Sequence, residues 1–319
     1  MRTRTSSILK LAAGGLLVVA TTFAGHDARS DSPAAPREVT PSGTGFAGVY
    51  GTMPADQAEF ISSPDTIKSA ALSGAPTLVW EALEHGEKVE CLDCIAVVAP
   101  LLYDGNAKTR EIAAWWLRRR VFGVFGDGEV YSQTVSTLAT DANPVRRADA
   151  AYALGEFFAT PGIAACATAL KTDLDAGVRA AAASALGRLN DDGAGALATG
   201  LADASPTVSL AALASVSRIN SFSGISSIAA LTSNANASVR QRAVEVLDAL
   251  DVSESVDVVA AAAKNDTAAT VRAAACHALG TFGVATSEDA SAMTVLQKLS
   301  ATDSDTFVRD QAQIALQRL

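Results

Sequence analysis

One pattern recurs seven times along the chain and constrains its fold more than any other feature. The reference position of each repeat is an arginine, or once a serine, at spacings of 30 to 37 residues: Arg110, Arg147, Arg179, Ser209, Arg240, Arg272 and Arg309. Three residues later every repeat has an alanine, seven residues later a leucine or valine, and six residues earlier an aspartate or asparagine. Chance does not align four columns in this way, so the chain is predicted to be a repeat protein.

Composition indicates which secondary structure fills the repeat. Alanine and leucine are abundant whereas β-branched and aromatic residues are sparse, a mix that favours helices because alanine loses no side-chain entropy on becoming helical. Hydrophobic residues make up 49% of the chain, enough to bury a large core. The predicted fold is an all-α solenoid of about seven helix pairs.

Each column has a physical interpretation within such a pair. The aspartate or asparagine lies in the turn, where it can accept from free backbone amides and cap the second helix: Asp104, Asp141, Asp173, Asp203, Asn234, Asp266 and Asp303. The alanine lets helices approach closely, and the leucine fills the layer between them. An arginine near a helix N-terminus is unfavourable for the helix dipole. We therefore predict a ladder in which each arginine bonds the turn aspartate or carbonyl groups of a neighbouring repeat.

The repeats resemble HEAT-like repeats of the type that also occurs in phycobilin lyases, here in an exported bacterial member. In that pattern an aspartate-containing turn precedes V-R-x-x-A-A-x-A-L-G, and the segments RRADAAYALG, VRAAAASALGRL and VRAAACHALG match it well; Thr109, Arg146 and Ser209 depart from it. The resemblance implies a right-handed superhelix with the second helices on the concave side. It says little about function, because such solenoids serve many unrelated roles, and a lyase active site is not visible.

The segment before the repeats predicts export. Arg2, Arg4 and Lys10 precede an apolar run over residues 11–20, and Thr22-Phe23-Ala24 offers small residues at a cleavage site, a pattern typical of a secretory signal peptide. We predict a signal peptide over 1–24, a flexible leader over 25–54, a helical cap over 55–92 and the solenoid over 93–319. The protein would then be periplasmic or extracellular, without stable membrane insertion after cleavage.

Charge narrows the class of partner. Cleavage after residue 24 removes three positive charges and no negative one, so the formal net charge goes from −9 to −12. An acidic protein is poorly suited to nucleic acid or anionic lipid, both of which require a positive surface. The acidic charge instead permits basic protein partners or cations.

The cysteines divide into two kinds. Cys166 and Cys276 lie in apolar helical stretches three repeats apart and look like small core residues. Cys91 and Cys94 are one helical turn apart in a compartment where thiols oxidise readily, so we expect a disulfide between them. Either it is a structural staple between the cap and the first repeat, or it is a redox-active pair.

The sequence offers no residue pattern that supports haem attachment, zinc binding or catalysis. Ile95 stands where haem attachment needs a histidine after CxxC, and His85 with the two cysteines supplies only three zinc ligands. We therefore expect no cofactor, no metal and no enzymatic activity.

The candidate binding residues lie on the second helices. Positions three, four and seven after the reference residue should face the core, and positions one, five and eight should point outward. Position five places Trp115 and Tyr152 next to each other, beside Arg118 and Arg119, and these residue types are enriched at binding hot spots. The alternative is that Trp115 packs between neighbouring helices or under the cap. The leading hypothesis is a non-catalytic scaffold that binds a protein partner here, and the second is a thiol-disulfide redox protein.

Overall fold

The computed structural model describes residues 63–121, 128–159, 161–219 and 221–319. The predicted signal peptide, the leader and residues 55–62 of the predicted cap lie outside these ranges. Within them the chain forms α-helices and short 3-10 helices and no strand. The predicted all-α class is confirmed.

The described part of the chain contains seven helix pairs, each joined by a short turn that carries the aspartate or asparagine column. In chain order the pairs are α4 (Leu92–Val98) continued by η2 (Ala99–Tyr103), with α5 (Ala107–Leu117); α6 (Glu129–Thr140) with α7 (Pro144–Glu156); α8 (Pro161–Thr172) with α9 (Ala176–Arg188); α10 (Asp191–Leu201) with α11 (Pro206–Val216); α12 (Ile225–Ala230) continued by η4 (Leu231–Ser233), with α13 (Ala237–Ala249); α14 (Val256–Asn265) with α15 (Ala269–Thr281); and α17 (Ala290–Thr302) with α18 (Thr306–Arg318). The short helices η5 (Ser253–Ser255) and α16 (Val284–Glu288) lie in the connections before α14 and α17.

Two further helices precede the first pair. These are α2 (Pro64–Ser73), which Ser63 caps by accepting from the Thr66 amide, and α3 (Pro76–His85), followed by η1 (Gly86–Lys88). They pack against α4 and α5 and correspond to the predicted helical cap.

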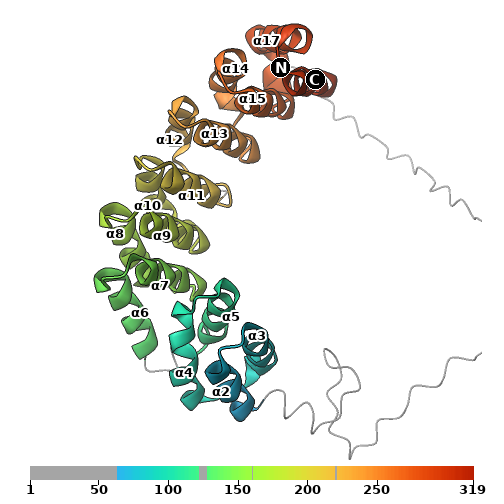
Figure 1. Ribbon diagram of the computed structural model, residues 1–319. Coiled ribbons are helices and arrows are strands. Elements are labelled where there is room, and N and C mark those ends of the chain that lie inside the picture. Colours follow the sequence, from blue (N-terminus) through green and yellow to red (C-terminus); the bar gives the residue numbers. More distant parts are fainter. Residues whose placement is uncertain (1–62, 122–127, 160, 220) are drawn as a thin grey trace, which may run out of the picture. The chain divides into compact units, whose positions relative to one another are not determined.

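Equivalent helices of neighbouring pairs lie side by side. The second helix of each pair packs on the second helix of the next, as α7, α9 and α11 do in Figure 1, and several first helices do the same. One layer is therefore made of first helices and the other of second helices. Each second helix from α7 to α15 contacts its own first helix and its two second-helix neighbours.

The core lies between these layers and is built from the repeat columns. All seven position-three alanines are fully buried, as are six of the seven position-seven residues: Ala113, Ala150, Ala182, Ala212, Ala243, Ala275 and Ala312, with Leu117, Leu154, Leu186, Val216, Leu247 and Leu279. Position six is buried as well, which the sequence analysis did not predict; Trp116 there has no exposed surface. A second helix thus has a wide apolar face because it meets neighbours on three sides.

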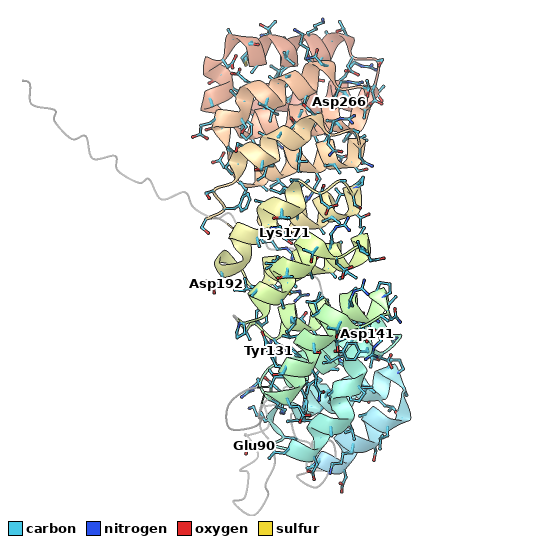
Figure 2. All side chains as sticks on the ribbon, turned by 90° about the vertical axis from the view of Figure 1, so that its left-hand side faces the viewer. Glu90, Tyr131, Asp141, Lys171, Asp192 and Asp266 are labelled. Atoms are coloured by element: carbon cyan, nitrogen blue, oxygen red, sulfur yellow. A yellow bond between two sulfur atoms is a disulfide. The ribbon has the colours of Figure 1, made fainter. Side chains whose placement is uncertain are left out.

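The turn column organises the chain before each second helix. All seven side chains accept from the backbone N–H two residues later, over 2.7–2.9 Å. The prediction that this residue itself caps the helix is wrong by two positions. The N-cap is the residue whose backbone N–H donates this bond, and its own side chain caps the helix in five repeats: Asn106, Asn143, Asp175, Asn236 and Asp305. Figure 2 shows the turn residues Asp141 and Asp266 on one edge of the stack and Asp192 on the opposite edge.

The reference arginines join neighbouring repeats. At four junctions the Nε and Nη2 atoms of one arginine donate to both carboxylate oxygens of the turn aspartate in the next repeat over 2.7–3.0 Å: Arg147 to Asp173, Arg179 to Asp203, Arg240 to Asp266 and Arg272 to Asp303. The remaining Nη1 donates to the carbonyl oxygen of the arginine's own turn residue. The carbonyl acceptors therefore belong to the same repeat, whereas the prediction placed them in a neighbour. The arginine hydrogen bonds hold the pKa of these four carboxyl groups below the ordinary range.

Three repeats depart from the ladder. Arg110 pairs with Asp149, at 2.9 Å, and not with the turn residue Asp141, which instead receives Arg146. Ser209 donates only to the carbonyl oxygen of Asp203 in its own turn. Arg309 in the last described helix also reaches only its own turn carbonyl, that of Asp303. The predicted ladder therefore has a substitute partner at its first junction and a gap between the fourth and fifth repeats.

Position eight controls how closely second helices approach. A Cβ atom added to Gly155 would lie 2.8 Å from the Cα of Ala185, and one added to Gly280 would lie 2.7 Å from the Cα of Ala315. Real Cβ atoms essentially never come so near to backbone. The prediction that position eight points outward is therefore wrong for these two glycines, which are buried between neighbouring helices.

The last helix ends the described stack with a polar face. Position four after the reference residue is fully buried in six repeats, where it is Ala114, Ala151, Ala183, Leu213, Val244 or Cys276. In α18 the equivalent residue is Gln313, and it is exposed. A polar residue here suits a capping helix, because no further repeat covers it within the described chain.

Candidate interaction surface

Two aromatic side chains and two arginines form the candidate surface on adjacent second helices. Trp115 comes from α5 and Tyr152 from α7, and both are half-buried. The guanidinium of Arg118 lies 5.3 Å from the centre of the Trp115 ring, and that of Arg188 from α9 lies 5.3 Å from the Tyr152 ring. We call Trp115, Arg118, Tyr152 and Arg188 the aromatic surface.

Trp115 satisfies both interpretations of its position. Part of its ring packs against the hydrophobic core, as the structural alternative requires. The remainder is exposed and has Arg118 over its face, an arrangement that stabilises the guanidinium by cation–π attraction. A partner could therefore contact the tryptophan without its leaving the core.

Tyr152 is held in place by a buried carboxylate. Burial, together with the charge of Glu156 and its hydrogen bond to the phenol, raises the pKa of Tyr152 to about 12. Glu156 itself is buried and forms an ion pair with Arg188 on the next second helix. The phenol therefore stays protonated at neutral pH and donates to Glu156, which fixes the ring orientation.

The three consecutive arginines 118 to 120 have different roles. Arg118 lies on the aromatic surface, and Arg119 forms an exposed ion pair with Glu87, at 3.1 Å. Arg120 is buried, and burial lowers its pKa to about 10. Its guanidinium lies 3.7 Å from the Trp116 ring centre and donates to four backbone carbonyl groups, those of Trp116, Gly86, Glu87 and Val89. Arg120 thus fastens the cap to the first pair.

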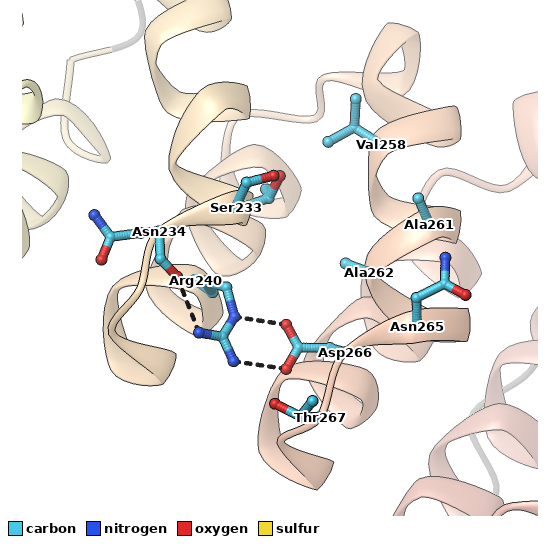
Figure 3. A pocket seen from close by; sticks show the side chains of 10 residues that line it. Ser233, Asn234, Arg240, Val258, Ala261, Ala262, Asn265, Asp266 and Thr267 are labelled. Carbon is cyan, nitrogen blue, oxygen red and sulfur yellow. Dashed lines mark hydrogen bonds and ion pairs between the residues drawn. The ribbon is translucent and has the colours of Figure 1, made fainter.

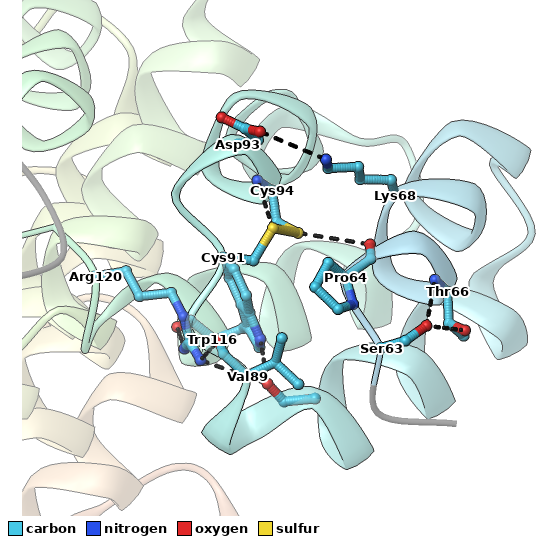
Figure 4. Close-up of a disulfide and its surroundings, with 11 residues drawn as sticks. Ser63, Pro64, Thr66, Lys68, Val89, Cys91, Asp93, Cys94, Trp116 and Arg120 are labelled. Carbon is cyan, nitrogen blue, oxygen red and sulfur yellow. Dashed lines mark hydrogen bonds and ion pairs between the residues drawn. A yellow bond between two sulfur atoms is a disulfide. The ribbon is translucent and has the colours of Figure 1, made fainter. Parts of the chain in front are cut away.

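The Cys91–Cys94 disulfide lies at this same contact (Figure 4). The Sγ atom of Cys91 accepts from the Cys94 amide and caps α4, while the Sγ atom of Cys94 lies 3.6 Å from the carbonyl oxygen of Pro64 at the start of α2. Trp116 adds a bond from its indole N–H to the Gly86 carbonyl oxygen, over 2.9 Å. Cys91 is 9% exposed and Cys94 is not exposed at all. The pair is placed as a staple, with little access for an attacking thiol.

The remaining titratable candidates do not form a second site. Burial raises the pKa of Cys166 and of Cys276 to about 12, so both stay as neutral thiols in the core. His85 is hydrogen-bonded to the carbonyl oxygen of Glu81. Across the described ranges no cluster of three or more histidine, cysteine, aspartate or glutamate side chains could hold a metal ion. In the same ranges no helix is long and apolar enough to cross a membrane.

Comparison with known families agrees with the helix pairs described above. Residues 225–317, which span the last three pairs, match a family model described as HEAT repeats. This segment consists of HEAT repeats. No curated protein sequence matches it.

Solved structures share this HEAT fold at low sequence identity. The X-ray structure of YibA from Escherichia coli is 16% identical with a TM-score of 0.51, over 86% of this chain and 98% of YibA. Kap95p, in its complex with RanGDP, is 14% identical with a TM-score of 0.57, over 83% of this chain and 41% of Kap95p. The CpcE–CpcF phycocyanin lyase complex from Nostoc sp. is 21% identical with a TM-score of 0.36, over 70% of this chain and 92% of that one. Such identities show the fold alone.

A pocket of about 580 Å³ opens between the fifth and sixth HEAT repeats (Figure 3). It lies between η4 and α14, and the Arg240–Asp266 pair forms one side of it. Both charged groups of that pair are occupied by each other and by the Asn234 carbonyl, so the pocket offers no free charge from them. The pocket results from the way in which the two repeats pack here, and the Arg240–Asp266 ion pair of the ladder occupies its polar end.

The sequence analysis missed one member of the aromatic surface, Arg188, and its buried partner Glu156. Arg188 and Glu156 stand at position nine after their reference residues, a position that was not considered. The signal was present, because position nine carries Arg119, Glu156, Arg188 and Arg218 in the first four repeats. One helical turn beyond position five, these side chains extend the same face.

Proposed function

We propose that this HEAT-repeat protein is an exported, non-catalytic scaffold that binds a protein partner through the aromatic surface of its second helices. The observation that carries the proposal is the pair of half-exposed aromatic rings, Trp115 and Tyr152, each beneath an arginine and each held by packing or a hydrogen bond. Rigid aromatic and arginine side chains contribute most to binding hot spots. The one carboxylate here, that of Glu156, is engaged by Arg188 and by the Tyr152 phenol, so no catalytic step is proposed.

Two further observations support the proposal. Kap95p, whose structure was solved with RanGDP bound, shares the fold. The signal-peptide pattern over residues 1–24 supports export, and a disulfide at Cys91–Cys94 suits an oxidising compartment.

Site-specific photo-crosslinking in the native envelope tests the binding face. A benzoylphenylalanine is placed at Arg118 or at Ser184, which is the exposed position-five residue of α9. The control position is Leu174, which is 98% exposed but lies in a turn at the edge of the stack. We expect a discrete protein adduct from positions 118 and 184 and none from 174. Equal adducts at all three positions, or none, would reject the proposed face.

Export is tested separately. N-terminal sequencing of the mature protein should give a start after residue 24, and cell fractionation should place it outside the cytoplasm. A full-length chain in the cytoplasm would contradict export without affecting the binding face.

The second candidate function is thiol-disulfide exchange at Cys91 and Cys94, favoured by their CxxC spacing at the start of α4. A redox-active pair would reduce insulin or exchange with glutathione, and Cys91→Ser would abolish this activity. A staple would show no exchange, and Cys91→Ser would instead lower the melting temperature. The burial of both sulfur atoms favours the staple.

A further inference from the structure

Charge is distributed unevenly along the face that carries the aromatic surface. At positions five, eight and nine, the first four repeats carry four arginines and one glutamate: Arg118, Arg119, Arg188, Arg218 and Glu156. The last three repeats carry two carboxylates and one arginine at these positions, namely Glu245, Asp248 and Arg318. The formal charge of the face is thus +3 in the first four repeats and −1 in the last three. This positive stretch stands out in a chain whose net charge is −9.

Two of these arginines have no carboxylate to neutralise them. Among the described residues, the Arg118 side chain is engaged only by the Trp115 ring. The Arg218 side chain is exposed and forms neither a hydrogen bond nor an ion pair there. The Arg119 pair with Glu87 is exposed on both sides, and such a pair contributes little, about 0 to 1 kcal/mol, so a competing carboxylate can displace it. Only Arg188 is paired with a buried carboxylate.

We propose that this stretch binds an acidic polypeptide segment of the partner, an inference that rests on the function proposed above. A guanidinium binds a carboxylate through two parallel N–H donors, and a ring beneath it orients the donors outward. Trp115 supplies that ring for Arg118, whereas Arg188 over the Tyr152 ring is already paired with Glu156. The half-buried rings leave no open face on which nucleic-acid bases could stack.

The spacing sets the length of the bound segment. Arg118 and Arg218 are three second helices apart, which at about 10 Å per layer gives roughly 30 Å. An extended peptide spans at most about 3.3–3.6 Å per residue. A segment of about nine or ten residues therefore reaches from the first repeat to the fourth.

Fluorescence anisotropy with a labelled deca-glutamate peptide and the mature chain, residues 25–319, tests the inference. The matched probe is deca-glutamine, measured at low and at high salt. We expect saturable binding of the glutamate peptide that weakens as salt rises, and binding of the glutamine peptide about tenfold weaker or absent. Equal binding of both peptides, or no binding of the glutamate peptide, overturns the inference.

Matched arginine variants locate the site. Arg118→Gln together with Arg218→Gln should weaken glutamate-peptide binding about fivefold or more. Arg318→Gln removes the position-nine arginine of the last repeat and should change nothing. If Arg318→Gln weakens binding as much as the double variant, the site is not here. If the double variant is unstable, Arg218→Gln alone replaces it in the same measurement, because the Arg218 side chain is exposed and has no partner to lose.

Failure of the peptide-binding experiment can be told apart from failure of the proposed function. Adducts at positions 118 and 184 without glutamate-peptide binding would reject an acidic partner segment but keep the binding face. Glutamate-peptide binding that competes with adduct formation at position 118 supports both. A labelled oligonucleotide that binds more tightly than the peptide would overturn the choice of a polypeptide.

Discussion

The junction between the third and fourth repeats differs from the junction between the fourth and fifth at two places. At the first, Arg179 holds both carboxylate oxygens of Asp203. A Cβ atom on Gly187 there would lie 2.9 Å from the Cα of Ser215, so the helices touch closely. At the second, the equivalents of Arg179 and Gly187 are Ser209 and Ser217.

The serine at the second junction preserves only half of the arginine's interactions. Ser209 donates to its own turn carbonyl, as the arginines do, but it cannot reach the next turn. That turn carries Asn234. Its side chain accepts from the Asn236 amide, as the turn aspartates of the other repeats accept from theirs, but it has no charge. The bond within the repeat is thus separable from the bond between repeats. Adhesion between repeats depends on two positions, one at each end of the second helix.

The largest expected effect comes from exchanging the residues at position eight. Gly187→Ser places a side chain against the Ser215 backbone and should lower the free energy of unfolding by about 2 to 3 kcal/mol. The reverse change at the looser junction, Ser217→Gly, removes a hydroxyl that donates to the Ala214 carbonyl and accepts from Arg242, and should cost about 1 kcal/mol. Urea denaturation of both variants measures the difference. Equal losses would mean that the two junctions are packed alike.

Removing a ladder arginine should be the next largest effect. The Arg147 and Asp173 side chains are 16% and 9% exposed, so Arg147→Gln leaves a largely buried carboxylate without its charged partner. We expect a loss of about 2 kcal/mol, the range found for hydrogen bonds to charged groups. The neighbouring Arg146→Gln is the control, because Arg146 is 45% exposed and its pair with Asp141 lies at the surface. A comparable change in the melting temperature for both variants would contradict a special role for the ladder.

The helix pairs could be predicted from the sequence because their cause is periodic. An alanine that recurs three residues after the reference position has to be small in every repeat, and all seven are fully buried. Cys166 and Cys276 followed from the same reasoning, since their columns are apolar. Periodicity of this kind reports which face of a helix is covered.

The contacts between repeats were predicted only in outline, as an arginine ladder between neighbouring repeats that four junctions confirm. The columns show that an arginine and an aspartate recur in every such repeat. Arg147, however, has an aspartate both in its own turn and in the next turn. Only the packing of α7 on α9 selects Asp173, the aspartate of the next turn. The fastening of the cap by Arg120 depends on a single non-repeating contact, for which no column exists. Gly155 was taken as outward-facing because a glycine has no side chain whose pattern could show that it is covered.

Building the missing rung should strengthen the looser junction. Ser209→Arg together with Asn234→Asp recreates the pair that Arg179 forms with Asp203 one repeat earlier. We expect a favourable coupling energy of about 1.5 kcal/mol in a double-mutant cycle, because each single change introduces a charge without its partner. Additive single and double effects would show that the two positions do not meet at this junction.

The smallest effect is the pH dependence of that gain. At existing rungs the pKa of Asp203 and of Asp266 lies below the ordinary 3.8 because the arginine of the preceding repeat donates hydrogen bonds to the carboxylate. Such a group stabilises the native state above its unfolded pKa, and the contribution is lost as pH falls through its lower native pKa, because the unfolded chain then binds more protons. The advantage of the Ser209→Arg and Asn234→Asp variant over the natural chain should therefore be constant from pH 7 to about 5 and shrink below about pH 4. Thermal melts over this range measure it. An advantage that persisted unchanged into strong acid would have to come from packing of the arginine side chain, and the charge pair would not be what separates the two junctions.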